Sequence, residues 1–464
     1  MYKSVEDSRK PIESNSNMST NTNLSHFHQR KAFVVGVGMT KFLKPGSHNF
    51  TYYDLGKQAV SRALIDSGIS YEKVESGFVG YVFQSSCAGQ RVLYEVGMTG
   101  IPIINVNNNC ATGSTAFYLA VNAVKSGSNE CAIALGFDQM KKGPLPMDLS
   151  EPTHPVYPYA ESLIKKGKFN PKIPSAPQLF GAAGAEHMQK YNTELKHLHK
   201  ISVKNYQHGL NNPYAQFRIS VSEADVEKSQ TICFPLNKLH CCPTSDGAAC
   251  AIICSEDFVI KNNLQDQAVE ISACCLGSDK HETFVGDSAI NLVGFNLAKE
   301  VSTKAYKQAG INANDIKVVE LHDCFSANEL ITYESLGLCE EGKAKEFIDK
   351  GENTYGGKFV VNPSGGLTSK GHPLGATGIA QITELTWQLR NMAEKRQVKD
   401  IKYALAHNLG LGSAVVVSIL KKYNDKFNTK EHQTSDPDKL EKIEKQIGLK
   451  KNSLMHLKNA KAKF

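Results

Sequence analysis

Short apolar runs and amphipathic helical patterns alternate along most of the chain. Strand-like apolar runs occupy residues 32–42, 78–83, 101–106, 131–138, 268–279, 318–321 and 359–362, and two more flank Gly410–Gly412. Between them, helical patterns cover residues 52–68, 89–98, 295–309, 326–337 and 376–390. Alternation of strand and helix is typical of a mostly parallel sheet that helices cover on both faces. The pattern therefore predicts an α/β fold.

This alternation is interrupted in three places, which divide the chain. Residues 1–31 are polar, rich in Ser and Asn and without periodicity, so we expect a disordered N-terminal extension. Residues 142–230 are first rich in Pro, Tyr and Lys and then helical, which indicates an inserted lid. The predicted organisation is a first half over 32–270 that includes this lid, a second half over 271–421, and a basic, partly helical tail over 422–464.

Composition and charge narrow the possible functions. Of 464 residues, 41% are hydrophobic and 21% charged, and no apolar run approaches the ~18 residues of a membrane span. The net charge is +7, but 12 lysines against 6 acidic residues after Leu420 place +6 of it in the tail. A basic tail is usually a solvated or targeting segment, so no nucleic-acid partner is expected. Twelve cysteines without a secretory signal indicate a reducing compartment.

A cysteine stands at the junction of a predicted strand and a predicted helix. Cys110 follows the run 101–106, which resembles a buried strand, and three asparagines; small residues then open a helix. The dipole and free N–H groups at a helix N-terminus can lower a thiol pKa from ~8.5 towards neutrality. Because the thiolate is the attacking species in acyl transfer, Cys110 is the candidate nucleophile. The alternative for Cys110, as for any of the twelve cysteines, is a structural role in the core.

Three further strand ends carry histidine, cysteine and glycine. His322 and Cys324 directly follow one apolar run, His372 lies in a glycine-rich loop, and Gly410 ends the next strand. Together with Cys110, these residues supply the parts of a nucleophile, a base, a second acid/base and a backbone oxyanion hole. No second ligand pair at metal-binding spacing accompanies the cysteine-rich segments, so no metal site is expected.

Five segments of the chain resemble the thiolase family. They read NNNCATGSTA, CCPTSDGAA, HDCFSANEL, NTYGGKFVVNPSGGLTSKGHPLGATG and AHNLGLGSAVV, in the order of the family, between residues 32 and 421. The segment GHPLGATG is typical of thiolases as a whole. HDCF in place of NEAF, and HNLG where most thiolases carry a second cysteine, indicate 3-oxoacyl-CoA thiolases of the sterol carrier protein-x type.

The resemblance implies a duplicated α/β fold of five αβαβα layers, with an inserted loop domain that covers the acyl-CoA. It also implies cleavage of a 3-oxoacyl-CoA by coenzyme A, through an acyl group carried on Cys110. His372 is then the base for Cys110, Cys324 the second acid/base, and His322 a donor in the hole that holds the enolate oxygen. The backbone N–H groups of Cys110 and Gly410 are expected to form the second oxyanion hole.

The same resemblance implies the ligands, the assembly and the pathway. Acyl-CoA and coenzyme A are expected as substrates, with no permanently bound cofactor, and the chain is expected to form a homodimer or a tetramer. The expected pathway is the β-oxidation of fatty acids or of branched or sterol side chains. The last three residues, Ala462-Lys463-Phe464, resemble a peroxisomal tripeptide with Phe in place of Leu. We therefore expect a peroxisomal location, while mitochondria and cytoplasm stay open.

Two other functions stay open from the residues alone. One is a condensing enzyme of the same fold, although such enzymes lack the combination of GHPLGATG with HDCF. The other is a non-catalytic lipid-binding or scaffold protein. The presence of Cys110, Cys324 and His372 argues against this second alternative.

Overall fold

Among the described residues, ten strands form one continuous sheet in the order β10-β9-β11-β12-β8-β1-β7-β4-β2-β3. The strands are β1 Ala32–Met39, β2 Ser76–Gly80, β3 Ile103–Val106, β4 Cys131–Asp138, β7 Gly247–Ser255, β8 Val269–Gly277, β9 Ile316–Glu320, β10 Val360–Val361, β11 Tyr403–Gly410 and β12 Ala414–Lys422. This computed structural model describes residues 30–143, 151–165, 169–170, 172–412, 414–423, 430 and 432–446. Most of the predicted N-terminal extension therefore lies outside the described residues.

The sheet consists of two halves with the same topology. The first half has the order β3-β2-β4-β7-β1 and the second the order β10-β9-β11-β12-β8. In each half the first two pairings are parallel and the next two antiparallel. The halves join where β1 pairs with β8. Identical strand order and pairing show a structural duplication, as the resemblance implied.

The prediction of a mostly parallel sheet is wrong. Four strand pairs are parallel and five are antiparallel. The antiparallel pairs come from the last two strands of each half and from the junction. For example, β12 follows β11 after a short turn, and strands joined by a tight turn run antiparallel.

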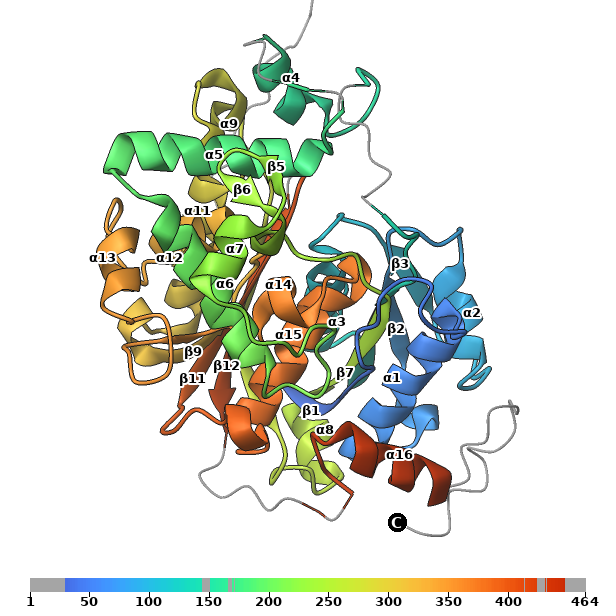
Figure 1. Cartoon of the computed structure of the whole chain (residues 1–464). Coiled ribbons are helices and arrows are strands. Elements are labelled where there is room, and N and C mark those ends of the chain that lie inside the picture. The colour runs from blue at the N-terminus through green and yellow to red at the C-terminus, as the bar shows by residue number, and fades with distance from the viewer. Residues whose placement is uncertain are drawn as a thin grey trace, which may run out of the picture.

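Helices form three layers around the two half-sheets (Figure 1). In the centre, α3 (Thr112–Lys125) packs against α15 (Leu374–Leu389). The outer face of the first half is covered by α1 (Tyr52–Ser67) and α2 (Ala88–Tyr94), and that of the second by α11 (Phe295–Ala309) and α12 (Ser326–Ser335). One buried apolar cluster lies at each outer face and one around α3 and α15. These are the predicted five αβαβα layers.

The remaining elements belong to the insertion and to connections. The insertion contains α4 Tyr157–Lys165, α5 Ser175–Tyr191, α6 Leu195–Gly209 and α7 Glu223–Lys228, and the hairpin of β5 Thr231–Cys233 and β6 Leu236–Asn237 follows it. The short helices are α8 Glu256–Lys261, α9 Glu282–Val285, α10 Ala289–Leu292, α13 Ala344–Asp349 and α14 Gly366–Lys370. Both α5 and α6 pack against α12, so the insertion lies over the second half.

Local sequence signals explain where α1 begins and ends. The Thr51 side chain accepts from the N–H of Asp54, whose carboxylate accepts from the N–H of Thr51, which is a capping box. Leu55, Ala59 and Ala63 form the buried face of the helix. Gly68 ends it with a φ of 69°, in the left-handed region that glycine adopts without strain. The predicted helix over 52–68 is thereby confirmed.

Because glycine has no side chain, the central helices can approach each other and the sheet closely. A Cβ atom at Gly113 on α3, or at Gly136 on β4, would overlap the carbonyl oxygen of Gly375 in the first turn of α15. This approach explains why the segment GHPLGATG carries small residues just after His372. It places the loop that carries His372 next to the N-terminal end of α3.

The strand that precedes Cys110 was expected to be buried, and it is not. β3 is the edge strand of the first half, and Ile104 is 46% exposed. Among the described residues, β3 pairs with β2 alone, so one of its edges has no neighbouring strand. None of the described helices is both long enough and apolar enough to cross a membrane.

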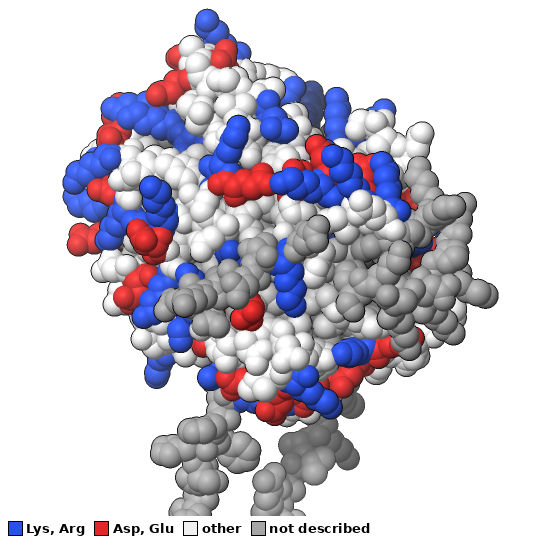
Figure 2. Space-filling view, turned by 90° about the horizontal axis from the view of Figure 1, so that it is seen from below, with Lys and Arg blue, Asp and Glu red and all other residues white. Residues whose placement is uncertain are grey.

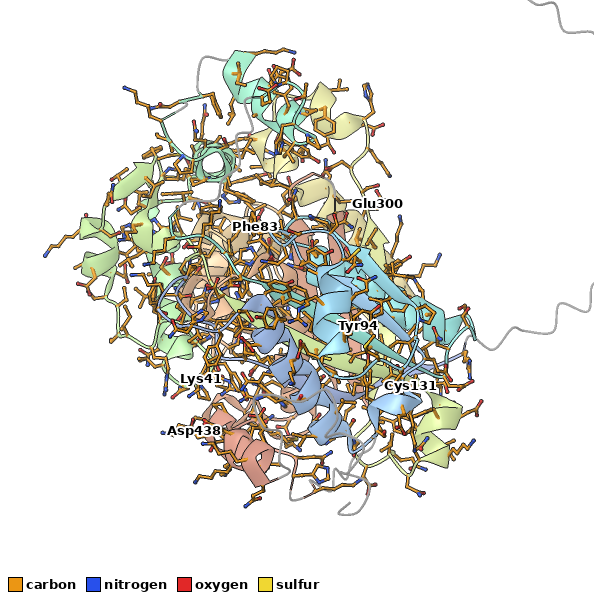
Figure 3. All side chains as sticks on the ribbon, turned by 90° about the vertical axis from the view of Figure 1, so that its right-hand side faces the viewer. Lys41, Phe83, Tyr94, Cys131, Glu300 and Asp438 are labelled. Carbon is orange, nitrogen blue, oxygen red and sulfur yellow. The ribbon has the colours of Figure 1, made fainter. Side chains whose placement is uncertain are left out.

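The tail folds back onto the first half through α16 (Pro437–Gln446). Leu440 is buried, Arg62 of α1 pairs with Glu444 at 2.7 Å, and Lys41 pairs with Asp438 at 3.1 Å (Figure 3). Residues 447–464, which include the terminal tripeptide, lie outside the described residues. On the face seen from below, basic and acidic side chains are interspersed and form no single basic patch among the described residues (Figure 2).

Candidate active site

The predicted site residues come from separate chain segments and meet between the two halves. Cys110 lies between β3 and α3, His322 and Cys324 follow β9, and His372 lies between α14 and α15. The sulfur of Cys110 and one ring nitrogen each of His322 and His372 lie within 4.8 Å of one another. The two imidazole rings meet edge to face, with their centroids 5.1 Å apart. The structure therefore brings the predicted nucleophile, base and enolate-hole donor together.

A turn of three asparagines presents Cys110. Asn109 has a φ of 48°, in the left-handed region that Asn tolerates better than most residues. The backbone N–H of Asn108 donates to Thr112 Oγ1 at 2.8 Å, and the N–H of Ala111 donates to the carbonyl oxygen of Asn108 at 3.0 Å. These bonds close the turn and fix Cys110 directly before α3.

Gly410, the last residue of β11, lies against this turn. A Cβ atom at position 410 would overlap the carbonyl oxygen of Asn108, so only glycine permits the approach. The side chain of Asn109 donates to the carbonyl oxygen of Leu411 at 2.6 Å and ties the two turns together. This proximity is compatible with an oxyanion hole formed by the N–H groups of Cys110 and Gly410, which stays a prediction.

The thiol of Cys110 does not have the lowered pKa that the sequence predicted. Burial raises the pKa of Cys110 to about 12, the charge of Asp138 adds to the rise, and the N–H of Cys110 itself opposes it. Loss of water around the sulfur outweighs the favourable end of α3. The resting thiol is protonated at neutral pH, so attack requires a base that removes its proton.

The hydrogen bonds of His372, the predicted base, leave one ring nitrogen with a lone pair. Thr377 Oγ1 donates its proton to the carbonyl oxygen of Pro373 at 3.0 Å, so it can only accept from His372 Nδ1, 2.7 Å away. The proton of His372 is then on Nδ1, and Nε2 carries a lone pair. Nε2 is buried and has no hydrogen-bond partner. Burial lowers the pKa of His372 to about 3, so the ring is neutral at rest.

His322 has the opposite tautomer. The side-chain N–H of Asn408 donates to His322 Nδ1 at 2.9 Å, which leaves the proton of the ring on Nε2. This Nε2 is also buried and unpaired. Burial, followed by the neighbouring His372 and His407, lowers the pKa of His322 well below its usual value. The site therefore contains one neutral imidazole that can accept a proton and one that can donate a hydrogen bond.

The same three residues are ligand types that zinc accepts. A metal needs a lone pair on each imidazole nitrogen, whereas His322 Nε2 carries a proton in this arrangement. The hydrogen bonds of the site therefore favour acid–base chemistry by Cys110, His322 and His372 over metal binding.

Cys324 is 5% exposed and lies beside another thiol. Its carbonyl oxygen accepts the N–H of Cys242 at 2.9 Å, where the two segments form a short antiparallel bridge. Burial raises the pKa of Cys324 well above its usual value, with smaller contributions from Cys242 and Cys110. Cys324 is a neutral thiol, as an acid must be. Cys242 was not predicted at the site, although it lies in the segment CCPTSDGAA.

Asp323, between the two predicted site residues His322 and Cys324, has a structural role. Its carboxylate accepts the N–H groups of Leu367 at 2.6 Å and Thr368 at 3.1 Å, and the side chain of Asn205 at 2.9 Å. Burial raises the pKa of Asp323 to about 7, and the neighbouring Glu329 adds to the rise. Asp323 therefore joins the segment of Cys324 to α14, which leads to His372. The only sequence signal was the position of Asp323 between His322 and Cys324.

A cavity of about 460 Å³ reaches the site at His372. Its walls come from α5, α6, the segment after α6 and the segment around Cys242, and most of them are apolar. Apolar lining side chains include Met140, Tyr206, Phe217, Ile219, Ile232 and Phe325. The cavity offers a water-poor approach to the histidine.

Comparison with protein families identifies the fold. Residues 32–257 match the family described as Thiolase, N-terminal domain, and residues 279–422 match Thiolase C-terminal domain-like. The chain belongs to the thiolase family. This membership confirms the resemblance and makes the chain an acyltransferase of EC class 2.3.1.

Several characterised relatives lie within the expected subgroup of thiolases. Sterol carrier protein 2 of Homo sapiens is 54% identical over 394 residues, which cover 84% of this chain and 72% of that protein. Non-specific lipid-transfer protein-like 2 of Caenorhabditis elegans is 44% identical over 401 residues, covering 84% of this chain and 96% of that protein. The chain is therefore similar to thiolases of the sterol-carrier type.

Solved structures confirm the thiolase fold. Human mitochondrial 3-ketoacyl-CoA thiolase superposes with a TM-score of 0.64 at 20% identity, covering 85% of this chain and 99% of that one. The Ltp2-ChsH2(DUF35) aldolase superposes with a TM-score of 0.71 at 22% identity, covering 85% and 98%. At these identities the likeness supports the fold, and the chemistry has to come from the residues of the site.

Proposed function

We propose that this chain is a 3-oxoacyl-CoA thiolase that forms an acyl intermediate on Cys110. The observation that carries the proposal is the pair of opposite tautomers around the thiol. His372 Nε2 has a lone pair that can take the proton of Cys110, and His322 Nε2 has a proton that can bind an oxyanion. Thiolysis needs a proton acceptor and an oxyanion donor beside the same bound substrate, because its nucleophile must be activated and its leaving group is an enolate.

The first half-reaction cleaves the carbon–carbon bond. His372 takes the proton of Cys110, and the thiolate attacks the 3-oxo carbon of the substrate. The N–H groups of Cys110 and Gly410 hold the resulting oxyanion. Its collapse breaks the bond between C2 and C3 and leaves an acyl group on Cys110. The oxygen of the departing enolate binds to the N–H of His322 and of protonated His372, and Cys324 protonates its carbon to give acetyl-CoA or propionyl-CoA.

The second half-reaction releases the acyl group. The Cys324 thiolate takes the proton of the incoming coenzyme A thiol, which then attacks the acyl-Cys110 thioester. Cys110 leaves as a thiolate and recovers its proton from His372. The neutral resting states of Cys324 and His372 are thereby restored, so the cycle balances in protons.

The apolar cavity supports a fatty acyl-CoA as substrate. Its volume of about 460 Å³ lies in the range of small-molecule sites, and His372 is among its lining residues. One structural relative was solved as a human mitochondrial 3-ketoacyl-CoA thiolase in complex with CoA. We propose that coenzyme A and its thioesters bind here, in β-oxidation of fatty acids or of branched or sterol side chains.

We also propose that the chain forms a homodimer, or a tetramer built from dimers, through β3. The free edge of β3 carries Ile104, which is 46% exposed, and Met98 before it is 71% exposed. An unpaired edge with apolar side chains is a template for pairing with a second copy. The Ile104→Lys variant should have a mass in solution near the chain mass of 50.8 kDa, whereas the unaltered chain should have a multiple of that mass. A monomeric unaltered chain would contradict the proposal.

The proposed compartment is the peroxisome. One support is the terminal tripeptide Ala462-Lys463-Phe464. The other is that all twelve cysteines are free thiols, as expected in a reducing compartment. A fluorescent protein fused in front of the chain should move from peroxisomes to the cytosol when the last three residues are removed. An unchanged distribution would refute the signal.

Thiolysis itself tests the main proposal. The full chain, mixed with acetoacetyl-CoA and coenzyme A, should consume the enolate absorbance of the substrate and yield acetyl-CoA. Cys110→Ala should abolish the reaction while leaving the thermal unfolding temperature unchanged, because only the sulfur is lost. Mass spectrometry after incubation with acetyl-CoA should find an acetyl group on Cys110. Turnover by Cys110→Ala, or an acetyl group on another cysteine, would overturn the assignment.

A further inference from the structure

Asn408 is buried at the position where most thiolases carry their second cysteine. It belongs to β11, two residues before Gly410, and is fully enclosed. Its amide touches two side chains from different parts of the chain, Ser114 on α3 and His322 after β9. The residue therefore lies between the helix that follows Cys110 and the proposed enolate hole.

The two ends of the Asn408 amide face different partners. Its oxygen, Oδ1, faces α3 and accepts from Ser114 Oγ at 3.0 Å. Its nitrogen faces His322 and donates to Nδ1 at 2.9 Å. Gly378 on α15 closes the space, because a Cβ atom there would overlap Ser114 Oγ and lie 2.8 Å from Asn408 Oδ1. The amide is thereby confined between Ser114 and His322, with its nitrogen towards the ring.

That orientation determines the chemistry of His322. A neutral imidazole carries one proton, and an N–H donor at Nδ1 requires the proton to be on Nε2. If the proton moved to Nδ1, Nε2 would turn a lone pair towards the enolate oxygen. The oxygen would meet repulsion in place of a hydrogen bond. Removal of a single hole donor typically costs a factor of about 100 to 1,000 in rate.

We propose that Asn408 is a positioning residue that keeps the proton of His322 on Nε2 and so completes the enolate hole. The proposal rests on the proposed thiolase function. Asn408 acts through His322 and contacts Ser114, so it replaces the missing cysteine in position and performs a different task. Cys324 supplies the proton, and Asn408 orients the group that holds the enolate.

The main test compares two reactions of Asn408→Ala in the full chain. Acetyl transfer from acetyl-CoA to Cys110 passes through no enolate and should stay within about two-fold of the unaltered chain. The kcat for cleavage of acetoacetyl-CoA should fall roughly 10- to 100-fold, with little change in KM. Ser418→Ala is the matched control, since Ser418 is a buried polar residue of neighbouring β12 that contacts Cys274. This control should change neither reaction.

Two further variants separate positioning from packing. In a His322→Ala background, Asn408→Ala should cause little additional loss, because its effect passes through His322. Asn408→Asp keeps the shape but accepts a proton from Nδ1, so His322 Nε2 carries a proton only when the ring is charged. Cleavage by Asn408→Asp should therefore decline as the pH rises through the pKa of His322, a decline absent from the unaltered chain.

Spectroscopy tests the tautomer without any activity. In the ¹⁵N-histidine-labelled chain, the His322 signals, assigned by their loss in His322→Gln, should show an unprotonated Nδ1 and a protonated Nε2. Asn408→Ala should lose this preference. Unimpaired cleavage in Asn408→Ala, equal loss of cleavage and acetyl transfer, or a protonated Nδ1 in the unaltered chain would each overturn the inference. An unaltered chain without thiolysis, but with the stated tautomer, would refute the proposed function and leave the role of Asn408 in the tautomer confirmed.

Discussion

Asp138, the last residue of β4, accepts a hydrogen bond from the backbone N–H of Gly375 in α15 at 2.5 Å. The other carboxylate oxygen accepts the N–H groups of Val82 and Phe83 at 3.0 Å each. One buried side chain thus joins the first half-sheet to the helix that follows His372. The proposed base His372, in the second half, is thereby positioned by a carboxylate of the first half.

Asp138→Ala should therefore destabilise the fold and weaken catalysis. The N–H group of Gly375, which is buried, and those of Val82 and Phe83, which are partly buried, would lose their acceptor. We expect this loss to lower the free energy of unfolding by about 3 kcal/mol at pH 7. Cleavage should fall as well, because α15 and His372 lose their anchor. Urea unfolding and the kcat for thiolysis check the two effects, and a variant as stable as the unaltered chain would contradict the anchoring role.

The stability of the chain should also depend on pH through Asp138. Burial raises the pKa of Asp138 to about 6, compared with ~3.9 for an unfolded aspartate. The folded state then binds the proton more tightly, so the contribution of this group to stability is complete below pH ~4 and declines as the pH rises through about 6. The stability difference between the unaltered chain and Asp138→Ala should be larger at pH 5 than at pH 7. A difference that grows with pH would have the wrong sign.

The raised pKa of Cys110 predicts slow, pH-dependent alkylation. With a pKa of about 12, only a small fraction of the thiol is ionised at pH 7, so its reaction with iodoacetamide should accelerate up to at least pH 9.5. Glutathione, an ordinary thiol, is the control and should level off near pH 9. Quantitative mass spectrometry of the peptide that contains Cys110 measures the rate. A plateau below pH 8 would show that α3 lowers the pKa after all.

Much of the fold could be predicted because local signals and packing agree. The helix over residues 295–309 was predicted with its observed bounds, because Gly294 and Gly310 stand directly before and after its amphipathic stretch. The junction of β3, Cys110 and α3 was likewise visible, because strand-forming, turn-forming and helix-forming residues follow one another there.

The pairing of strands and the exposure of β3 could not be predicted in the same way. Both depend on which strands lie side by side, and the alternation of strand and helix does not specify those neighbours. The pKa of Cys110 was mispredicted for a related reason. The sequence indicates the helix end, whereas the burial that dominates the shift comes from segments distant in the chain.

The roles of His322 and His372 were expected from the resemblance, but their tautomers could not be. The tautomer of His372 is determined by Thr377, which is five residues away along the chain, and that of His322 by Asn408, which is 86 residues away. No sequence pattern specifies that the amide of Asn408 turns its nitrogen to the ring. In the structure the nitrogen faces His322 and the oxygen faces Ser114, two partners that are far from Asn408 along the chain.

The position of α16 predicts what removal of the tail would do. Leu440 of α16 is 3% exposed, and Glu444 of α16 pairs with Arg62 on the first half. The cavity is lined by other segments. A chain truncated after Tyr423 should keep its kcat for thiolysis but unfold at a lower temperature. Leu440→Ala alone should lower the free energy of unfolding by roughly 2 to 3 kcal/mol. Unchanged stability on truncation would contradict the docking of α16.

The second-cysteine role is tested by Cys324→Ala. If Cys324 protonates the departing enolate, Cys110 should still take an acetyl group from acetyl-CoA, while cleavage of acetoacetyl-CoA should fall by roughly 100-fold or more. Ser418→Ala again serves as the control. Near-normal cleavage by Cys324→Ala would mean that His372, His322 or water carries the proton.

A thiol returned to position 408 should not rescue this loss. Other thiolases carry a cysteine there, so Asn408→Cys in the Cys324→Ala background places a thiol at a familiar position. In this chain, however, the amide of Asn408 donates to His322 Nδ1, and a cysteine is too short and too weak a donor to replace it. The double variant would gain an acid and lose the oriented His322, so its cleavage rate should stay at or below that of Cys324→Ala. Recovery of ten-fold or more would show that the thiol matters more than the tautomer, and the division of labour between Cys324 and Asn408 would be refuted.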